Sequence, residues 1–139
     1  SDGFVYVLCS GGYDHYQLPE LIVINPSSNT ITRTLQWTST SDYPQHLAKS
    51  PTGDTILFLN NGVFAYPICN SSIPASPVFE AGGTNLYNLA VDPQNADIYV
   101  TDAGDYVSDG NLKIYSSAGV LKSTVQAGRI PSSIVFYIK

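Results

Sequence analysis

Positive charge is scarce in this sequence of 139 residues. Lysine and arginine together number 6 against 11 aspartates and glutamates, which gives a formal net charge of −5 at pH 7. So few cations, spread along the chain, cannot form the continuous basic stripe that follows nucleic-acid phosphates. Nucleic acid is therefore excluded as a partner.

Long apolar runs and targeting signals are missing as well. No stretch approaches the roughly 18 consecutive apolar residues of a membrane span, and no signal peptide is recognisable. The chain enters an apolar, strand-like run within its first few residues. We therefore expect a trimmed or mature product.

Cysteine is limited to Cys9 and Cys69, each of which follows an apolar, strand-like run. Two cysteines alone are too few for a structural zinc site. We expect two small buried side chains, and a disulfide between them is the alternative.

Tyrosine, glycine and proline are plentiful instead, with 10, 11 and 9 copies. This composition is typical of many short strands joined by tight turns. It indicates an all-β domain.

An internal repeat is the strongest signal in the chain. Residues 43–58 align without gaps on residues 85–100, at a constant offset of 42 residues. The identical pairs are Leu47 and Leu89, Ala48 and Ala90, Pro51 and Pro93, and Ile56 and Ile98. A period of about 40 to 50 residues built from short strands is typical of β-propeller blades, which are four-stranded antiparallel sheets.

One unit of the repeat can be followed strand by strand. Strands are predicted at residues 89–91, 97–101, 111–115 and 120–126, with an Asp-Pro turn after the first and a loop at 102–110. The first two strands are the more apolar, as inner strands between neighbouring blades should be. The last two alternate apolar and polar residues, as outer strands should.

The whole chain fits about three such four-stranded blades, at residues 1–42, 43–84 and 85–126, followed by a closing strand at 131–138. The first blade has strands at 4–8, 21–24 and 30–37 and lacks its innermost strand. The second runs from Gln45 to Ala65 and ends in a fourth strand near residues 78–80. The fold class is thus a β-propeller, of which this chain is one partial unit.

The number of blades requires further partners, because propellers are typically built from four or more blades. In one alternative, two copies of the chain join head to tail into a six-bladed ring, and each terminal strand completes the partner's first blade. In the other, this chain is the C-terminal part of a six- or seven-bladed propeller whose N-terminal blades are missing or lie on another chain. We favour the second.

The last third of the chain resembles the C-terminal blades of YncE-like propellers with the YVTN repeat. The resemblance is carried by residues 97–110, 112–115, 117–119 and 127–131, with Phe136. The similarity is to secreted or surface-anchored members from Bacteroidetes. It implies export to the bacterial periplasm or cell surface, with lipoprotein anchoring as one route, and a binding scaffold without catalysis. Some surface relatives capture cobamides.

Candidate ligand-binding residues gather near strand ends and in loops. His46 and Asn88 occupy equivalent positions at the starts of two inner strands, so both should point to one mouth of the central channel. The other candidates are Tyr13, His15, Tyr16, Tyr43, Tyr87, Tyr106 and Arg129. As a ligand site they would bind a small molecule such as a cobamide, or a glycan. As structure alone, the polar groups satisfy the backbone and the tyrosines fill seams between blades.

Catalysis and metal binding find little support. No nucleophile-elbow or similar motif accompanies the two histidines, so we expect no enzyme and no cofactor. The loop at 102–110 holds three aspartates that could bind calcium, but it lacks the EF-hand spacing. We expect a tight turn there, with aspartates that accept backbone N–H bonds. Three classes of function remain: a ligand-binding module, a propeller that docks another envelope protein, and, last, a lyase or hydrolase.

Overall fold

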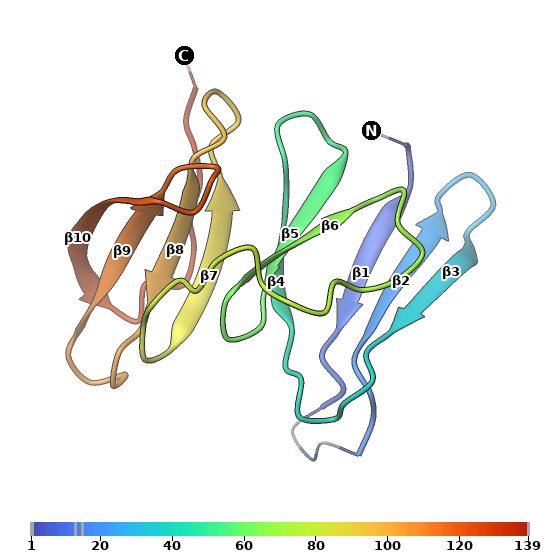
Figure 1. The fold of residues 1–139 in the computed structure, drawn as a ribbon, viewed down its shortest axis with the longest axis horizontal. Coiled ribbons are helices and arrows are strands. Elements are labelled where there is room, and N and C mark those ends of the chain that lie inside the picture. Colours follow the sequence, from blue (N-terminus) through green and yellow to red (C-terminus); the bar gives the residue numbers. More distant parts are fainter. Residues whose placement is uncertain (1, 13, 15, 139) are drawn as a thin grey trace.

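The computed structural model describes residues 2–12, 14 and 16–138, and these form three antiparallel sheets in chain order (Figure 1). Sheet 1 contains β1 (Val5–Cys9), β2 (Glu20–Asn25) and β3 (Thr30–Gln36). Sheet 2 contains β4 (Gln45–Lys49), β5 (Thr55–Leu59) and β6 (Val63–Pro67). Sheet 3 contains β7 (Leu86–Val91), β8 (Ile98–Asp102), β9 (Asp109–Tyr115) and β10 (Leu121–Arg129). None of the described residues belongs to a helix that could cross a membrane.

The repeat in the sequence is also a repeat in strand pairing. Ala48 of β4 pairs with Leu57 of β5, and Ala90 of β7 pairs with Tyr99 of β8, 42 residues further along. All four strands predicted for residues 85–126 are present, in the spatial order β10-β9-β8-β7. The all-β prediction and the sheet-by-sheet organisation are confirmed.

Sheet 2 is smaller than predicted. The expected fourth strand near residues 78–80 is reduced to a single bridge between Val63 and Phe79. Pro74 and Pro77 precede this segment, and a proline cannot donate a hydrogen bond to a ladder. A full strand therefore does not form there, and sheet 2 keeps three strands.

Sheet 2 lies between the other two sheets and packs on both, because successive side chains of a strand point to opposite faces. Ile56 and Phe58 of β5 belong to a buried cluster shared with sheet 1, whereas Leu57 and Leu59 belong to a cluster shared with sheet 3. The innermost strands β4 and β7 also contact each other. These two apolar layers hold the sheets side by side.

The layer between sheets 1 and 2 is centred on aromatic rings. Phe58 is fully buried; its ring stacks on Phe64 at a centroid distance of 5.2 Å and meets Trp37 edge-on at 5.5 Å. Such paired rings add packing energy beyond the apolar area they bury.

The C-terminal segment 131–138 forms no strand in this structure. It runs beside sheet 3, where the Asn88 side chain donates a hydrogen bond to the carbonyl of Ser132 at 2.6 Å and Phe136 packs edge-on against Tyr99. A strand needs a free neighbouring edge, and in the head-to-tail alternative that edge belongs to the first blade of a partner copy; the β1 edge of this chain lies across the molecule in sheet 1 (Figure 1). The closing strand and the blade boundaries therefore stay predictions.

The two cysteines differ from the expectation of buried residues. Both are free thiols; Cys9 is half-buried and Cys69 is exposed. Strand β6 ends at Pro67, which leaves Cys69 in the turn that follows instead of in the sheet. The prediction of two buried side chains is wrong for Cys69.

Candidate functional site

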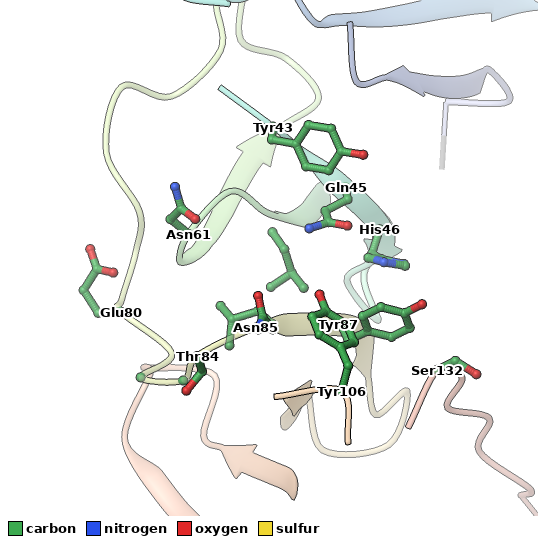
Figure 2. A pocket seen from close by; sticks show the side chains of 14 residues that line it. Tyr43, Gln45, His46, Asn61, Glu80, Thr84, Asn85, Tyr87, Tyr106 and Ser132 are labelled. Atoms are coloured by element: carbon green, nitrogen blue, oxygen red, sulfur yellow. The ribbon is translucent and has the colours of Figure 1, made fainter. Parts of the chain in front are cut away.

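A cavity of about 900 Å³ opens between sheets 2 and 3, at the end where β4 and β7 begin (Figure 2). Antiparallel pairing brings the end of β5 and the β8–β9 loop to this same end. The side chains and backbone that line it are those of Tyr43, Gln45, His46, Leu59, Asn61, Glu80, Gly82, Gly83, Thr84, Asn85, Leu86, Tyr87, Tyr106 and Ser132. The cavity is thus shared between two sheets.

Each of the two inner strands has a β-bulge where it borders the cavity. In β4 the regular pairing is interrupted between Gln45 and Ala48, and His46 within this gap has a left-handed φ of 57°. In β7 the interruption lies between Leu86 and Asn88, and it contains Tyr87. Bulges change the direction of a side chain and are frequent beside functional sites. Both bulged residues line the cavity.

Aromatic rings cover one side of the cavity. The His46 and Tyr87 rings lie 6.4 Å apart, and Tyr87 meets Tyr106 edge-on at 6.0 Å. Tyr106 also has a left-handed backbone, with φ of 63°, an uncommon conformation for a bulky residue. Figure 2 shows these rings together with Tyr43, and the polar side chains of Glu80 and others lie across from them.

The opposite wall, residues 81–85, is held by a carboxylate of sheet 3. The side chain of Asp102 accepts backbone N–H bonds from Thr84 at 3.3 Å, from Asn85 at 3.0 Å and from Gly104 at 3.0 Å. The Asn85 amide donates in turn to the Gly104 carbonyl at 2.6 Å. The wall and the β8–β9 loop are therefore joined through one carboxylate.

Two side chains of β9 extend the same connection. Lys113 lies 3.2 Å from the Asp102 carboxylate and also donates to the carbonyl of Gly82. The Tyr115 hydroxyl donates to the carbonyl of Ala81. Every residue from 81 to 85 except glycine 83 thus makes a hydrogen bond to sheet 3 or its loops.

The electrostatics of the cavity follow from these contacts. Burial alone would raise the pKa of Asp102, but the N–H bonds from Asn85 and Gly104 and the Lys113 ammonium outweigh it and hold the pKa below 3.8. Burial lowers the pKa of His46 below 6.5, so its ring is neutral at pH 7. Among the described residues, the lining includes one carboxylate, that of Glu80, and no lysine or arginine. The cavity is polar but lacks a cation.

The structure brings together four of the nine candidate residues: Tyr43, His46, Tyr87 and Tyr106 line the cavity. Asn88 lies just outside it and bonds to the lining residue Ser132.

The remaining four candidates are not in the lining. Tyr16 is 83% exposed in the β1–β2 connection, and Arg129 is exposed at the end of β10. Tyr13 and His15 lie outside the described residues. Sheet 1 therefore contributes nothing to this cavity among its described residues.

Several polar residues of the lining were not among the predicted candidates, for example Gln45, Asn61, Glu80 and Asn85. One signal could have found Asn85, because it stands 42 residues after Tyr43 and so occupies the equivalent position in the next unit. Glu80 and Asn61 have no such counterpart and lie in connections whose course the repeat does not predict.

In the loop at 102–110, aspartate side chains accept backbone N–H bonds, as predicted for a tight turn. Asp102 accepts the N–H bonds described above, and Asp105 accepts N–H bonds from Val107 at 2.9 Å and from Ser108 at 2.7 Å. Within residues 2–12, 14 and 16–138 no group of three or more histidine, cysteine or carboxylate side chains is arranged to hold a metal ion.

The contact given for the His46 ring is with an aromatic ring, that of Tyr87. A histidine that acts as a general base needs a nucleophile within hydrogen-bond reach.

Comparisons with known proteins bear on the fold. No family model matches the sequence, and no curated protein matches it. Among solved structures, a quinoprotein alcohol dehydrogenase-like protein from Bacteroides thetaiotaomicron is similar over 97% of this chain and 34% of its own, with a TM-score of 0.71 and 21% identity. The chain has a β-propeller-type fold.

Other similar structures are more distant. A nidogen/laminin complex matches 89% of this chain and 48% of its own, with a TM-score of 0.57 and 13% identity. Regucalcin, a calcium-binding protein from Agrobacterium tumefaciens, matches 88% and 44%, with a TM-score of 0.51 and 12% identity. The propeller chain thus spans less than half the length of each of these structures. Identities this low bear on the fold alone, and the resemblance to YncE-like propellers stays a prediction.

Proposed function

We propose that this part of a propeller is a non-catalytic binding module, and that the cavity between sheets 2 and 3 binds a neutral glycan. The observation that carries the proposal is a row of aromatic rings, those of His46, Tyr87 and Tyr106, in a hollow of about 900 Å³ that is also lined by polar amides and hydroxyls. Ligand sites combine flat apolar surface with a few placed polar groups in this way, and their volumes are about 300 to 1,000 Å³.

Sugar chemistry suits this lining. A sugar ring has apolar C–H faces that pack on a tyrosine ring, and hydroxyls around its rim that need hydrogen bonds. Tyr87 and Tyr106 offer such faces at a steep angle to each other. Gln45, Asn61 and Asn85 can donate and accept hydrogen bonds with hydroxyl groups.

Charge favours a neutral glycan over a cobamide. Cobamides carry a phosphate, and phosphates in protein sites are bound chiefly by arginine, lysine or backbone N–H groups. The described lining offers a carboxylate, Glu80, and no such cation. A cobamide is therefore the second ligand to test. Export to the periplasm or cell surface, proposed from the YncE-like resemblance alone, would place the cavity where environmental glycans are found.

We also propose that other propeller sheets pack against the outer faces of this unit. On sheet 1 the face turned away from sheet 2 bears Val5 and Val7, 46% and 39% exposed, and their cross-strand partners Ile24 and Ile22. Ile31, paired with Ile24 and 62% exposed, extends the same surface. A contiguous apolar face of this kind marks a protein interface, and this chain covers less than half the length of each similar structure.

A glycan array, followed by calorimetric titration of the best neutral oligosaccharide and of cyanocobalamin, tests the binding function. We expect an oligosaccharide to bind the intact protein and cyanocobalamin to bind more weakly or not at all. Binding of cyanocobalamin alone would replace the glycan by a cobamide, and binding of neither would reject the small-ligand function. The mass of the intact protein in solution tests the packing proposal, because a monomer of about 15 kDa would leave both outer faces uncovered.

A further inference from the structure

We propose that the Asp102–Lys113 pair positions the cavity wall at residues 81–85, and so determines whether the cavity has its binding shape. Neither side chain lines the cavity; both lie behind its wall and act on it through the main chain. Only the effect on affinity rests on the proposed binding function. The effect on the wall itself does not.

The wall has little structure of its own. Residues 81–85 belong to no strand, and they include two consecutive glycines, of which Gly82 has a left-handed φ of 47°. Glycine increases the conformational freedom of a segment. A segment of this kind keeps one conformation only if outside groups fix it.

Asp102 supplies those contacts from the rigid end of β8. Its carboxylate is 8% exposed and accepts the N–H groups of Thr84 and Asn85 on the wall and of Gly104 on the adjacent loop. A charged acceptor makes stronger hydrogen bonds than a neutral one. The wall and the loop that carries Tyr106 are thereby fixed to the same carboxylate.

Lys113 compensates the buried negative charge of Asp102 and makes a further hydrogen bond to the wall. Its ammonium is 15% exposed on the side chain, lies 3.2 Å from the carboxylate and donates to the Gly82 carbonyl. A carboxylate buried to this extent without its cation would destabilise the folded state. The Lys113 ammonium is therefore bound to the Asp102 carboxylate and to the wall, and Lys113 is not among the lining residues.

The same sheet provides a matched control. Lys122 of β10 binds Asp97 at 2.6 and 2.7 Å, at the opposite end of β8 from Asp102. Asp97 is also a poorly exposed carboxylate paired with one lysine. Asp97→Asn and Lys122→Met therefore remove a second lysine–carboxylate pair of sheet 3, whose lysine is more exposed than Lys113, without touching the wall.

The test is hydrogen exchange of the intact protein followed by mass spectrometry, without ligand. In Asp102→Asn we expect peptides covering residues 82–87 and 103–106 to exchange about ten- to a hundredfold faster, the size expected for lost hydrogen bonds to a charged group. Lys113→Met should act in the same direction, and Lys113→Arg should restore protection. Asp97→Asn and Lys122→Met should leave these peptides unchanged.

Unchanged exchange in Asp102→Asn and Lys113→Met would overturn the proposal. So would acceleration spread evenly over β7 to β10, because that pattern belongs to general loss of stability. A second arm measures affinity for the neutral oligosaccharide found by the array, which should fall at least tenfold in Lys113→Met and stay constant in Lys122→Met. If no oligosaccharide binds the wild type but the wall peptides respond, the binding function fails and the positioning role stands.

Discussion

Gly83 offers a sharp test of how closely the cavity wall fits against Asp102. A Cβ atom added at this position would lie 2.7 Å from Oδ2 of Asp102 and 2.9 Å from Cδ2 of Leu86. The leucine methyl group can turn aside at little cost. The carboxylate oxygen cannot, because the Thr84 N–H group and the Lys113 ammonium both hold it.

Alanine at position 83 therefore forces the carboxylate to give up about one charge-assisted hydrogen bond. Such a bond contributes about 1.5 to 3 kcal/mol, so Gly83→Ala should lower the free energy of unfolding by that amount. Urea denaturation followed by tyrosine and tryptophan fluorescence measures this change, provided that the m-value stays constant.

Gly128→Ala is the matched control for Gly83→Ala. Nothing lies within 4 Å of the Cβ that it would add, so it should change stability by less than about 1 kcal/mol, in either direction. Equal effects of the two substitutions would refute the close fit between the wall and Asp102.

Three further predictions concern the core and the wall. Phe58→Leu keeps most of the buried volume but loses two ring pairs, each of which contributes about 0.5 to 1.5 kcal/mol. It should therefore lower the free energy of unfolding, measured by urea denaturation, by about 1 to 3 kcal/mol. The same substitution at the exposed Phe4 should lower it by less than about 0.5 kcal/mol, and equal effects would contradict the packing of sheets 1 and 2. Thr101→Val should raise the melting temperature, because the buried Thr101 hydroxyl has no hydrogen-bond partner among the described residues, and a lower melting temperature would show that this hydroxyl is satisfied. The pKa of Asp102 is depressed in the folded state, so its contribution to stability should be complete above its unfolded pKa of 3.8 and disappear as the pH falls through the folded value. Acid titration of the wild type and Asp102→Asn should therefore converge at low pH, and a constant difference between them would contradict this linkage.

Much of the fold could be predicted because the repeat carries it. Leu89 and Ile98 stand 42 residues after Leu47 and Ile56, and the same strand pairing recurs at that offset. The missing fourth strand of sheet 2 was not predicted, although two nearby prolines gave a physical reason for its loss.

The candidate site was predictable only in part. Tyrosines at strand ends pointed to Tyr43, Tyr87 and Tyr106, because strand ends of neighbouring sheets meet at one end of the molecule. The bulges that turn His46 and Tyr87 into the cavity depend on how two strands pair, and an alternating pattern of side chains does not encode that slip. Asp102 fixes the wall by accepting backbone N–H bonds from residues that lie 17 and 18 positions earlier in the sequence. Backbone donors are the same for every residue type except proline, so no pattern of side chains reveals these bonds.

The participation of the cavity tyrosines in binding is tested most directly by titrating the neutral oligosaccharide into two tyrosine variants of the intact protein. Tyr87→Ala removes the ring that contacts both His46 and Tyr106, whereas Tyr16→Ala removes an exposed ring outside the cavity. We predict that Tyr87→Ala weakens binding at least tenfold, as loss of a central aromatic contact does, and that Tyr16→Ala binds like the wild type. Equal affinity of Tyr87→Ala and the wild type would contradict binding between sheets 2 and 3.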